Sequence, residues 1–124
     1  MSLILIIEDN EKNMKLARDV LQVKGYTTLE AVSGEEGVKL AVEQKPDLVL
    51  MDIQLPGMNG IEALRVLRAN PVTAEIPVIA VTASVMQQDR KQITEAGFDA
   101  YVGKPINLKE FLDAVRKALE GKPL

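Results

Sequence analysis

The chain has 124 residues, of which 47% are hydrophobic and 27% are charged, and this composition is typical of a single globular domain in water. It contains no cysteine and no histidine, so disulfides, zinc sites with these ligands, thiol catalysis and any triad that relies on imidazole are excluded. A formal net charge of −3 argues against a nucleic-acid partner, and the N-terminal apolar run is too short to insert into a membrane, so we expect a cytoplasmic protein.

The first half of the chain predicts two strands and two helices. The apolar run over residues 3–7 predicts a buried strand, and residues 11–24 have the apolar period of a helix. The buried side of this helix is predicted to contain Met14, Ala17, Val20 and Leu21. A weaker strand is expected over 27–31. Ser33 and Glu36 have the spacing of a capping box, which predicts the start of a second helix.

The second half of the chain continues the alternation of strands and helices. Three further strands are predicted, over residues 48–51, 78–81 and 100–103. A helix follows the turn at Pro56 and Gly57, with Ile61, Leu64 and Leu67 on one face. The last helix has the clearest apolar period, formed by Leu108, Phe111, Leu112, Val115 and Leu119. Asn107 is its expected N-cap.

The helix between the last two strands differs from the others. Residues 85–96 are mostly polar, and only Met86, Ile93 and Ala96 could hold this helix to the sheet. Ser84 and Gln87 have capping-box spacing at its start. We therefore expect the least firmly packed helix of the domain here.

Five strands that alternate with five helices predict the fold class. The strands are near-continuous apolar runs, as expected for parallel strands with helices on both faces of the sheet. We predict a flavodoxin-like (βα)5 architecture, a doubly wound five-stranded parallel sheet with strand order 2-1-3-4-5.

Polar residues directly follow four of the predicted strands: Glu8 and Asp9, Asp52, Thr82 and Lys104. The first and third strands are neighbours in the predicted order, so Asp9 and Asp52 are expected to face each other at the carboxyl edge of the sheet. Carboxylates about 5 Å apart repel by roughly 3 kcal/mol per pair at an effective dielectric near 20, unless they are protonated, paired with a cation or bridged by a metal. Carboxylate oxygens suit Mg²⁺. In the competing interpretation Asp9 or Asn10 only caps the first helix and Asp52 only ends a strand, but this does not explain acids at both strand ends.

The other residues at this edge suit phosphoryl chemistry. An aspartate such as Asp52 can accept a phosphoryl group and form an acyl phosphate. Lys104 could pair with phosphate oxygens, and the hydroxyl of Thr82 could bond another. Tyr101, in the last strand, is either ordinary packing or a side chain that changes position as Thr82 moves. Lys104–Pro105 is a candidate cis peptide.

These residues lie within five segments that together resemble one family: Ile7-Glu8-Asp9-Asn10, the run from Asp47 to Asp52, the run from Leu55 to Gly60, Val81-Thr82-Ala83, and the run from Tyr101 to Pro105. In this order they resemble the receiver domain of two-component response regulators over essentially the full chain. The segments around Glu8 to Leu16 and Met51 to Pro56 are especially similar to the DivK type of cell-cycle regulator, and similar segments occur in receivers of hybrid kinases.

The resemblance implies a phosphorelay switch. Asp52 would receive a phosphoryl group from a histidine kinase or histidine phosphotransferase, while Glu8, Asp9, Asp52 and the backbone carbonyl of Gln54 would bind Mg²⁺. Thr82 and Lys104 would contact the phosphoryl oxygens, and Thr82 and Tyr101 would pass the signal to the surface of the fourth helix, fifth strand and fifth helix. That surface would bind downstream proteins.

The resemblance also predicts the organisation of the protein. Because the chain ends just after the last predicted helix, we expect a stand-alone receiver domain over residues 1–124 without an output domain, present as a monomer or weak dimer. It would not be an enzyme in the usual sense, since only its own phosphorylation and dephosphorylation are expected.

Three other functions compete with this interpretation. A haloacid-dehalogenase-type phosphatase would need a second aspartate two positions after Asp52, where this chain has Gln54. A flavin- or nucleotide-binding module would need an anion cradle after the first strand, where Glu8, Asp9 and Glu11 would repel phosphate. A constitutive interaction module that is never phosphorylated stays open.

Overall fold

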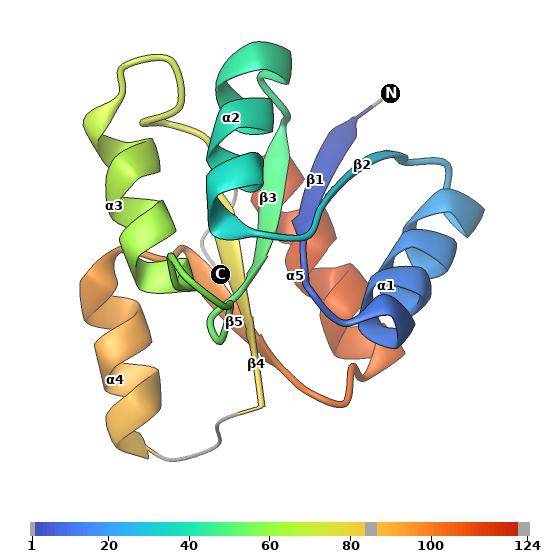
Figure 1. The fold of residues 1–124 in the computed structure, drawn as a ribbon. Helices are drawn as coiled ribbons and strands as arrows, with labels where there is room; N and C mark the ends of the chain where they lie inside the picture. Colours follow the sequence, from blue (N-terminus) through green and yellow to red (C-terminus); the bar gives the residue numbers. More distant parts are fainter. Residues whose placement is uncertain (1, 84–86, 122–124) are drawn as a thin grey trace.

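The computed structural model describes residues 2–83 and 87–121, with side chains over 2–83 and 91–121. Its elements alternate strictly between strand and helix (Figure 1). They are β1 (Leu3–Ile7), α1 (Glu11–Val23), β2 (Thr27–Ala31), α2 (Gly34–Gln44), β3 (Leu48–Asp52), α3 (Gly60–Ala69), β4 (Val78–Thr82), α4 (Gln87–Ala96), β5 (Ala100–Gly103) and α5 (Leu108–Glu120). None of the described helices is long and apolar enough to span a membrane.

The five strands form one parallel sheet with the order β2-β1-β3-β4-β5, which confirms the predicted topology. In this order β1 and β3 are direct neighbours, and Ile7 lies opposite Met51. The doubly wound order therefore brings the ends of β1 and β3 together at one edge of the sheet.

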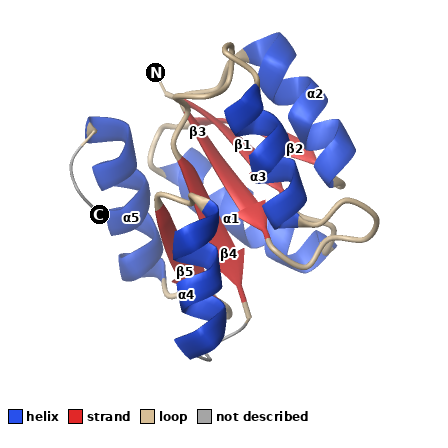
Figure 2. Cartoon of the chain, turned by 90° about the vertical axis from the view of Figure 1, so that its left-hand side faces the viewer, coloured by secondary structure: helices blue, strands red, loops and turns tan. Residues whose placement is uncertain are grey.

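The sheet separates two apolar cores. One lies under α2, α3 and α4 and contains the largest buried residues of α3, Leu64 and Leu67. The other lies under α1 and α5 and is centred on Phe111 and Val115. Figure 2 shows α3 and α4 in front of the sheet and α1 behind it. Because both faces are covered, the strands are apolar on both sides, as the near-continuous runs predicted.

The helix starts agree with the sequence in most details. Asn107 caps α5 by accepting a hydrogen bond from the Glu110 amide. Ser33 caps α2 by accepting from the Glu36 amide, but the predicted capping box is incomplete because the Glu36 carboxylate accepts from the Val32 amide instead. A complete capping box, between Asn59 and Glu62, forms at the start of α3, which was predicted as a helix after a turn but without a cap.

The packing of α5 and α4 differs in part from the predicted packing. Leu108 was expected on the buried side of α5, and this is wrong: its side chain is 51% exposed, because it is the first residue of the helix, next to the N-cap. Ile93 is buried and anchors α4, as expected. The expected anchor Met86 and the Ser84–Gln87 cap lie outside the described side chains.

An arginine ties several elements together at the amino edge of the sheet. The Arg68 guanidinium, near the end of α3, donates hydrogen bonds to the carbonyls of Ala74, Ile76 and Gly97 at 3.0, 2.6 and 3.3 Å. It also pairs with the Asp99 carboxylate at 2.9 Å, and the same oxygen accepts from the Val78 amide at 2.8 Å. This Arg68 network joins α3, the first residue of β4 and the segment between α4 and β5.

Candidate functional site

The predicted site residues lie at the carboxyl edge of the sheet, as expected. Glu8 directly follows β1, and its amide donates to the carbonyl of Ala31 at the end of β2. Asp52 and Thr82 are the last residues of β3 and β4, one residue longer than these strands were predicted to be. Lys104 follows β5, and its amide donates to the Thr82 carbonyl at 2.8 Å. Strand pairing thus fixes the relative positions of all four backbones.

The structure brings the three predicted acidic ligands into one cluster. Each of Glu8, Asp9 and Asp52 offers a carboxylate oxygen that lies within 4.8 Å of the other two. Glu8 and Asp52 are each only 5% exposed, whereas Asp9 is exposed. The cluster thus combines two buried acids with one acid that is exposed to solvent.

Lys104 is the cation of this site. Its ammonium nitrogen lies 2.8 Å from Glu8 Oε1 and 3.1 Å from Asp52 Oδ2. The Lys104 side chain is 16% exposed and both carboxylates are 6% exposed, so water screens these pairs poorly. One ammonium group therefore offsets much of the repulsion between two buried carboxylates.

Backbone amides hold the other oxygen of each buried acid. The Asn10 amide donates to Glu8 Oε2 at 3.1 Å, and the Gln54 amide donates to Asp52 Oδ1 at 3.0 Å. Each of these amides lies two residues after its acceptor, in the loop that follows the strand. The two carboxylates are thus oriented by their own loops as well as by Lys104.

These contacts shift the pKa values of the charged groups. Burial raises the pKa of Glu8 above its ordinary value, and the nearby Asp52 carboxylate adds to this, although the hydrogen bonds from Lys104 and Asn10 act in the opposite direction. Burial by itself would lower the pKa of Lys104, but its bonds to Glu8 and Asp52 outweigh burial and raise that pKa. Lys104 therefore stays charged at neutral pH.

A glycine allows the loop after Asp52 to close tightly. A Cβ atom at Gly60, the first residue of α3, would lie 2.5 Å from the Asp52 carbonyl oxygen and 2.8 Å from the Ile53 Cα. At such short distances a Cβ atom would force the backbone of the loop to move. Only glycine fits there, so α3 begins directly against the backbone of the predicted phosphoacceptor.

Thr82 and Tyr101 occupy different surroundings. Thr82 is 2% exposed at the end of β4. Tyr101 is 40% exposed and lies on β5, where it lines a separate cavity with Ile93 and Phe98 rather than the acid site. The peptide bond between Lys104 and Pro105 is cis, as the sequence analysis suggested.

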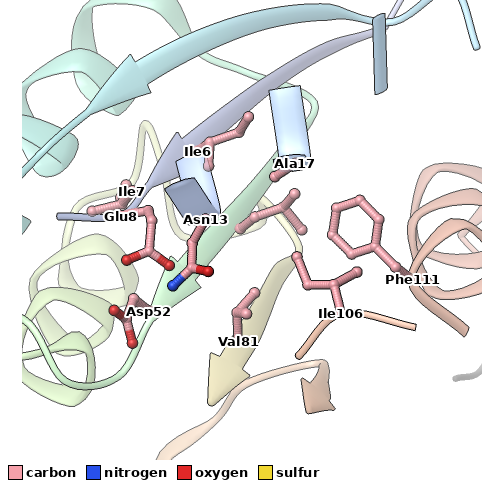
Figure 3. Close-up of a pocket in the computed structure, with 10 residues that line it drawn as sticks. Ile6, Ile7, Glu8, Asn13, Ala17, Asp52, Val81, Ile106 and Phe111 are labelled. Carbon is pink, nitrogen blue, oxygen red and sulfur yellow. The ribbon is translucent and has the colours of Figure 1, made fainter. Parts of the chain in front are cut away.

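One polar residue that lines the site, Asn13, was not predicted from the sequence. A small pocket contains Glu8 and Asp52, and Asn13 of α1 lines it with them. The remaining walls are apolar: Ile6, Ile7, Ala17, Leu50, Val81, Ile106 and Phe111. In Figure 3 the carboxamide of Asn13 points toward the two carboxylates. Asn13 lies one helical turn before the buried Ala17, and that spacing could have indicated its direction.

The arrangement fits a small divalent cation. Three carboxylates supply the hard oxygen ligands that Mg²⁺ prefers, and the exposed Asp9 leaves room for retained water. The predicted fourth ligand, the Gln54 carbonyl, belongs to the residue whose amide binds Asp52. An aspartate beside a cation site, a lysine and a hydroxyl is an arrangement that can accept a phosphoryl group.

The chain is similar to a known protein family and to individual members of it. The family model of the response regulator receiver domain matches residues 4–116. The polar-differentiation response regulator DivK of Brucella ovis is 45% identical over 116 residues, which cover 94% of this chain and 94% of that protein.

Solved structures agree in fold. The receiver domain of a sensor histidine kinase from Pseudomonas aeruginosa, determined with a magnesium ion coordinated in its active-site cleft, superposes with a TM-score of 0.89 at 32% identity. The match covers 96% of this chain and 98% of that one. A putative response regulator from Chloroflexus aurantiacus superposes with a TM-score of 0.92 at 28% identity, with the same coverage.

Proposed function

Because this chain belongs to the response regulator receiver domain family, we propose that it is a phosphorylation switch in which Asp52 is the phosphoacceptor. The observation that carries the proposal is the position of Lys104, within 3.1 Å of both Glu8 and Asp52 at a buried strand end. An aspartate held between a lysine and two further acids is equipped to receive a charged group together with a cation.

The donor is a phosphohistidine on a histidine kinase or a histidine phosphotransferase. An Asp52 carboxylate oxygen attacks phosphorus, and the bond from phosphorus to the imidazole nitrogen breaks with its electron pair leaving on that nitrogen. The products are an acyl phosphate on Asp52 and a neutral imidazole once a proton has been taken up. This chain has no histidine, so the donor is another protein.

The residues around Asp52 have separate roles in the proposed transfer. Glu8, Asp9, Asp52 and the Gln54 carbonyl would hold Mg²⁺, which when bound would offset negative charge on the transferring group. Lys104 pairs with phosphoryl oxygens once it has exchanged part of its contact with Asp52. The Thr82 hydroxyl bonds another phosphoryl oxygen.

The signal then leaves the site through Thr82 and Tyr101. Thr82 is buried at the end of β4, and Tyr101, on the neighbouring strand, is 40% exposed. Movement of Thr82 toward the phosphoryl group changes the position of Tyr101 and so the affinity of the α4, β5 and α5 surface for a downstream protein. We place this exchange in the cytoplasm.

Acetyl phosphate tests the central claim. With Mg²⁺, the wild-type protein is expected to gain the mass of one phosphoryl group, and hydroxylamine should remove it because an acyl phosphate is labile. Asp52→Asn should gain none, while the matched control Asp113→Asn, on α5, should react like wild type. A wild-type protein without the adduct, or an Asp52→Asn variant with a full adduct, would refute the proposal.

A further inference from the structure

The pocket beside the acids contains one neutral polar side chain, that of Asn13. The pocket is otherwise lined by Glu8, Asp52 and apolar residues, among them Phe111 and Ile106. In Figure 3, the Asn13 carboxamide enters from α1 and points toward the space beside the two carboxylates. Asn13 therefore brings a polar group of α1 to the pocket that contains Glu8 and Asp52.

The Asn13 backbone is firmly placed. Asn10 caps α1, and its side-chain oxygen accepts hydrogen bonds from the amides of Lys12 and Asn13 at 3.0 and 3.1 Å. The Asn10 amide in turn donates to Glu8 Oε2. The start of α1 and the Glu8 carboxylate are thus joined by hydrogen bonds, which fix the position of the Asn13 backbone relative to Glu8.

The Asn13 carboxamide is half-buried and, within the part of the chain that the structure describes, makes no hydrogen bond to another residue. A half-buried amide with apolar neighbours gains from a hydrogen-bonding partner. The oxygens that face it belong to predicted Mg²⁺ ligands, and Mg²⁺ typically keeps several bound waters.

We propose that Asn13 is a positioning residue of the phosphoryl-transfer site, whose carboxamide hydrogen-bonds the water shell of the bound Mg²⁺ beside Glu8. This inference rests on the proposed function, since it requires that the acid cluster binds the cation. A carboxamide can donate to a carboxylate and accept from a bound water at the same time. It thereby orients the ligand set without adding negative charge that would repel an incoming phosphoryl group.

The test compares Mg²⁺ binding in four proteins by NMR titration with magnesium chloride, following the amides of Asn10 and Gln54. Asn13→Leu keeps the branched shape of the side chain but replaces both hydrogen-bonding atoms by methyl groups, and Asn13→Gln keeps the carboxamide. Gln22→Ala is the control, because it removes a carboxamide from the same helix about 13 Å away along its axis. Thermal unfolding without metal checks that each variant folds.

We expect Asn13→Leu to bind Mg²⁺ about 10-fold more weakly than wild type, since outer contacts of a metal site typically contribute 10–100-fold in affinity. Asn13→Gln should recover most of the loss, and Gln22→Ala should match wild type. The rate of phosphorylation by acetyl phosphate should fall in Asn13→Leu at low Mg²⁺ and recover at saturating Mg²⁺.

The outcomes separate the two proposals. If wild type binds Mg²⁺ and becomes phosphorylated while Asn13→Leu binds Mg²⁺ within twofold of it, the role of Asn13 is wrong and the proposed function stands. If Asn13→Leu and Asn13→Gln lose affinity equally, a carboxamide is not what the site needs, and the role is again wrong. If wild type neither binds Mg²⁺ nor accepts a phosphoryl group, both proposals fall.

Discussion

One ammonium group compensates two buried carboxylates at the end of the sheet. Lys104 lies within 3.1 Å of Glu8 and Asp52, and all three side chains are at most 16% exposed. Removing one partner of a buried ion pair leaves an uncompensated buried charge. This destabilises a protein more than replacing both partners by apolar residues does. The same lysine therefore stabilises the fold and serves the proposed chemistry.

Replacing Lys104 by methionine should lower the stability of the metal-free protein and make stability depend on Mg²⁺. We expect Lys104→Met to lower the free energy of unfolding by about 3 kcal/mol in EDTA at neutral pH. Mg²⁺ should return part of the loss, because it supplies positive charge at the same carboxylates. Urea denaturation with and without Mg²⁺ measures both effects.

The control for that experiment is Lys12→Met on the exposed side of α1, which should change stability by less than about 0.5 kcal/mol. Equal stability of Lys104→Met and wild type in EDTA would contradict the compensating role of Lys104.

Glu8 gives the metal-free protein a defined pH dependence. Burial raises its folded-state pKa, so the folded protein binds this proton more tightly than the unfolded chain does. The stability from protonated Glu8 is present below the ordinary pKa of 4.5 and is lost as pH rises through the raised folded pKa. In EDTA, the stability of wild type relative to Glu8→Gln should therefore fall with rising pH across this window and then level off.

Chemical denaturation between about pH 4 and 8 measures this difference in stability. A difference that increases with pH would show that the hydrogen bonds from Lys104 and Asn10, which lower the pKa of Glu8, outweigh burial.

Lys104 affects stability in a separate pH range. Because its folded-state pKa is raised, its stabilisation is complete below the ordinary pKa of 10.5 and is lost as pH rises through the higher folded pKa.

Among the elements, the amino edge of the sheet depends on Arg68. Its guanidinium binds three backbone carbonyls and Asp99, and Asp99 binds the first amide of β4. We expect Arg68→Ala to lower the free energy of unfolding by about 2 kcal/mol, since hydrogen bonds to charged groups contribute about 1.5–3 kcal/mol. Urea denaturation gives the value.

Arg65→Ala is the matched control, because Arg65 is exposed on the same helix one turn earlier. The acid site lies at the other edge of the sheet, so phosphorylation by acetyl phosphate should persist in both variants. An Arg68→Ala variant as stable as Arg65→Ala would show that water replaces the network without loss.

Sequence patterns predicted the elements well where a local rule applied. The strand over Thr27–Ala31 and the Asn107 cap were predicted as they occur, because period and capping depend on neighbouring residues. The Arg68 network could not be predicted, since three of its acceptors are backbone carbonyls, which any residue provides. Leu108 was misjudged because a helical period does not indicate how far the sheet extends beside the first turn.

For the whole molecule, the strand order was predictable because alternating parallel strands and covering helices leave few arrangements. That order alone was enough to place Glu8, Asp9 and Asp52 in one cluster. The bridging geometry of Lys104 and the direction of Asn13 required coordinates, since both depend on how long or flexible side chains pack across different elements.

The distribution of the site along the chain has a consequence for protein synthesis. Glu8 follows the first strand and Asp52 ends the third, whereas Lys104 follows the fifth. A nascent chain that has emerged from the ribosome only as far as β4 therefore carries both acids without their internal counter-charge. The acidic end of the sheet is completed only when the last strand docks, so translation itself sets the order in which the charges of this site are assembled.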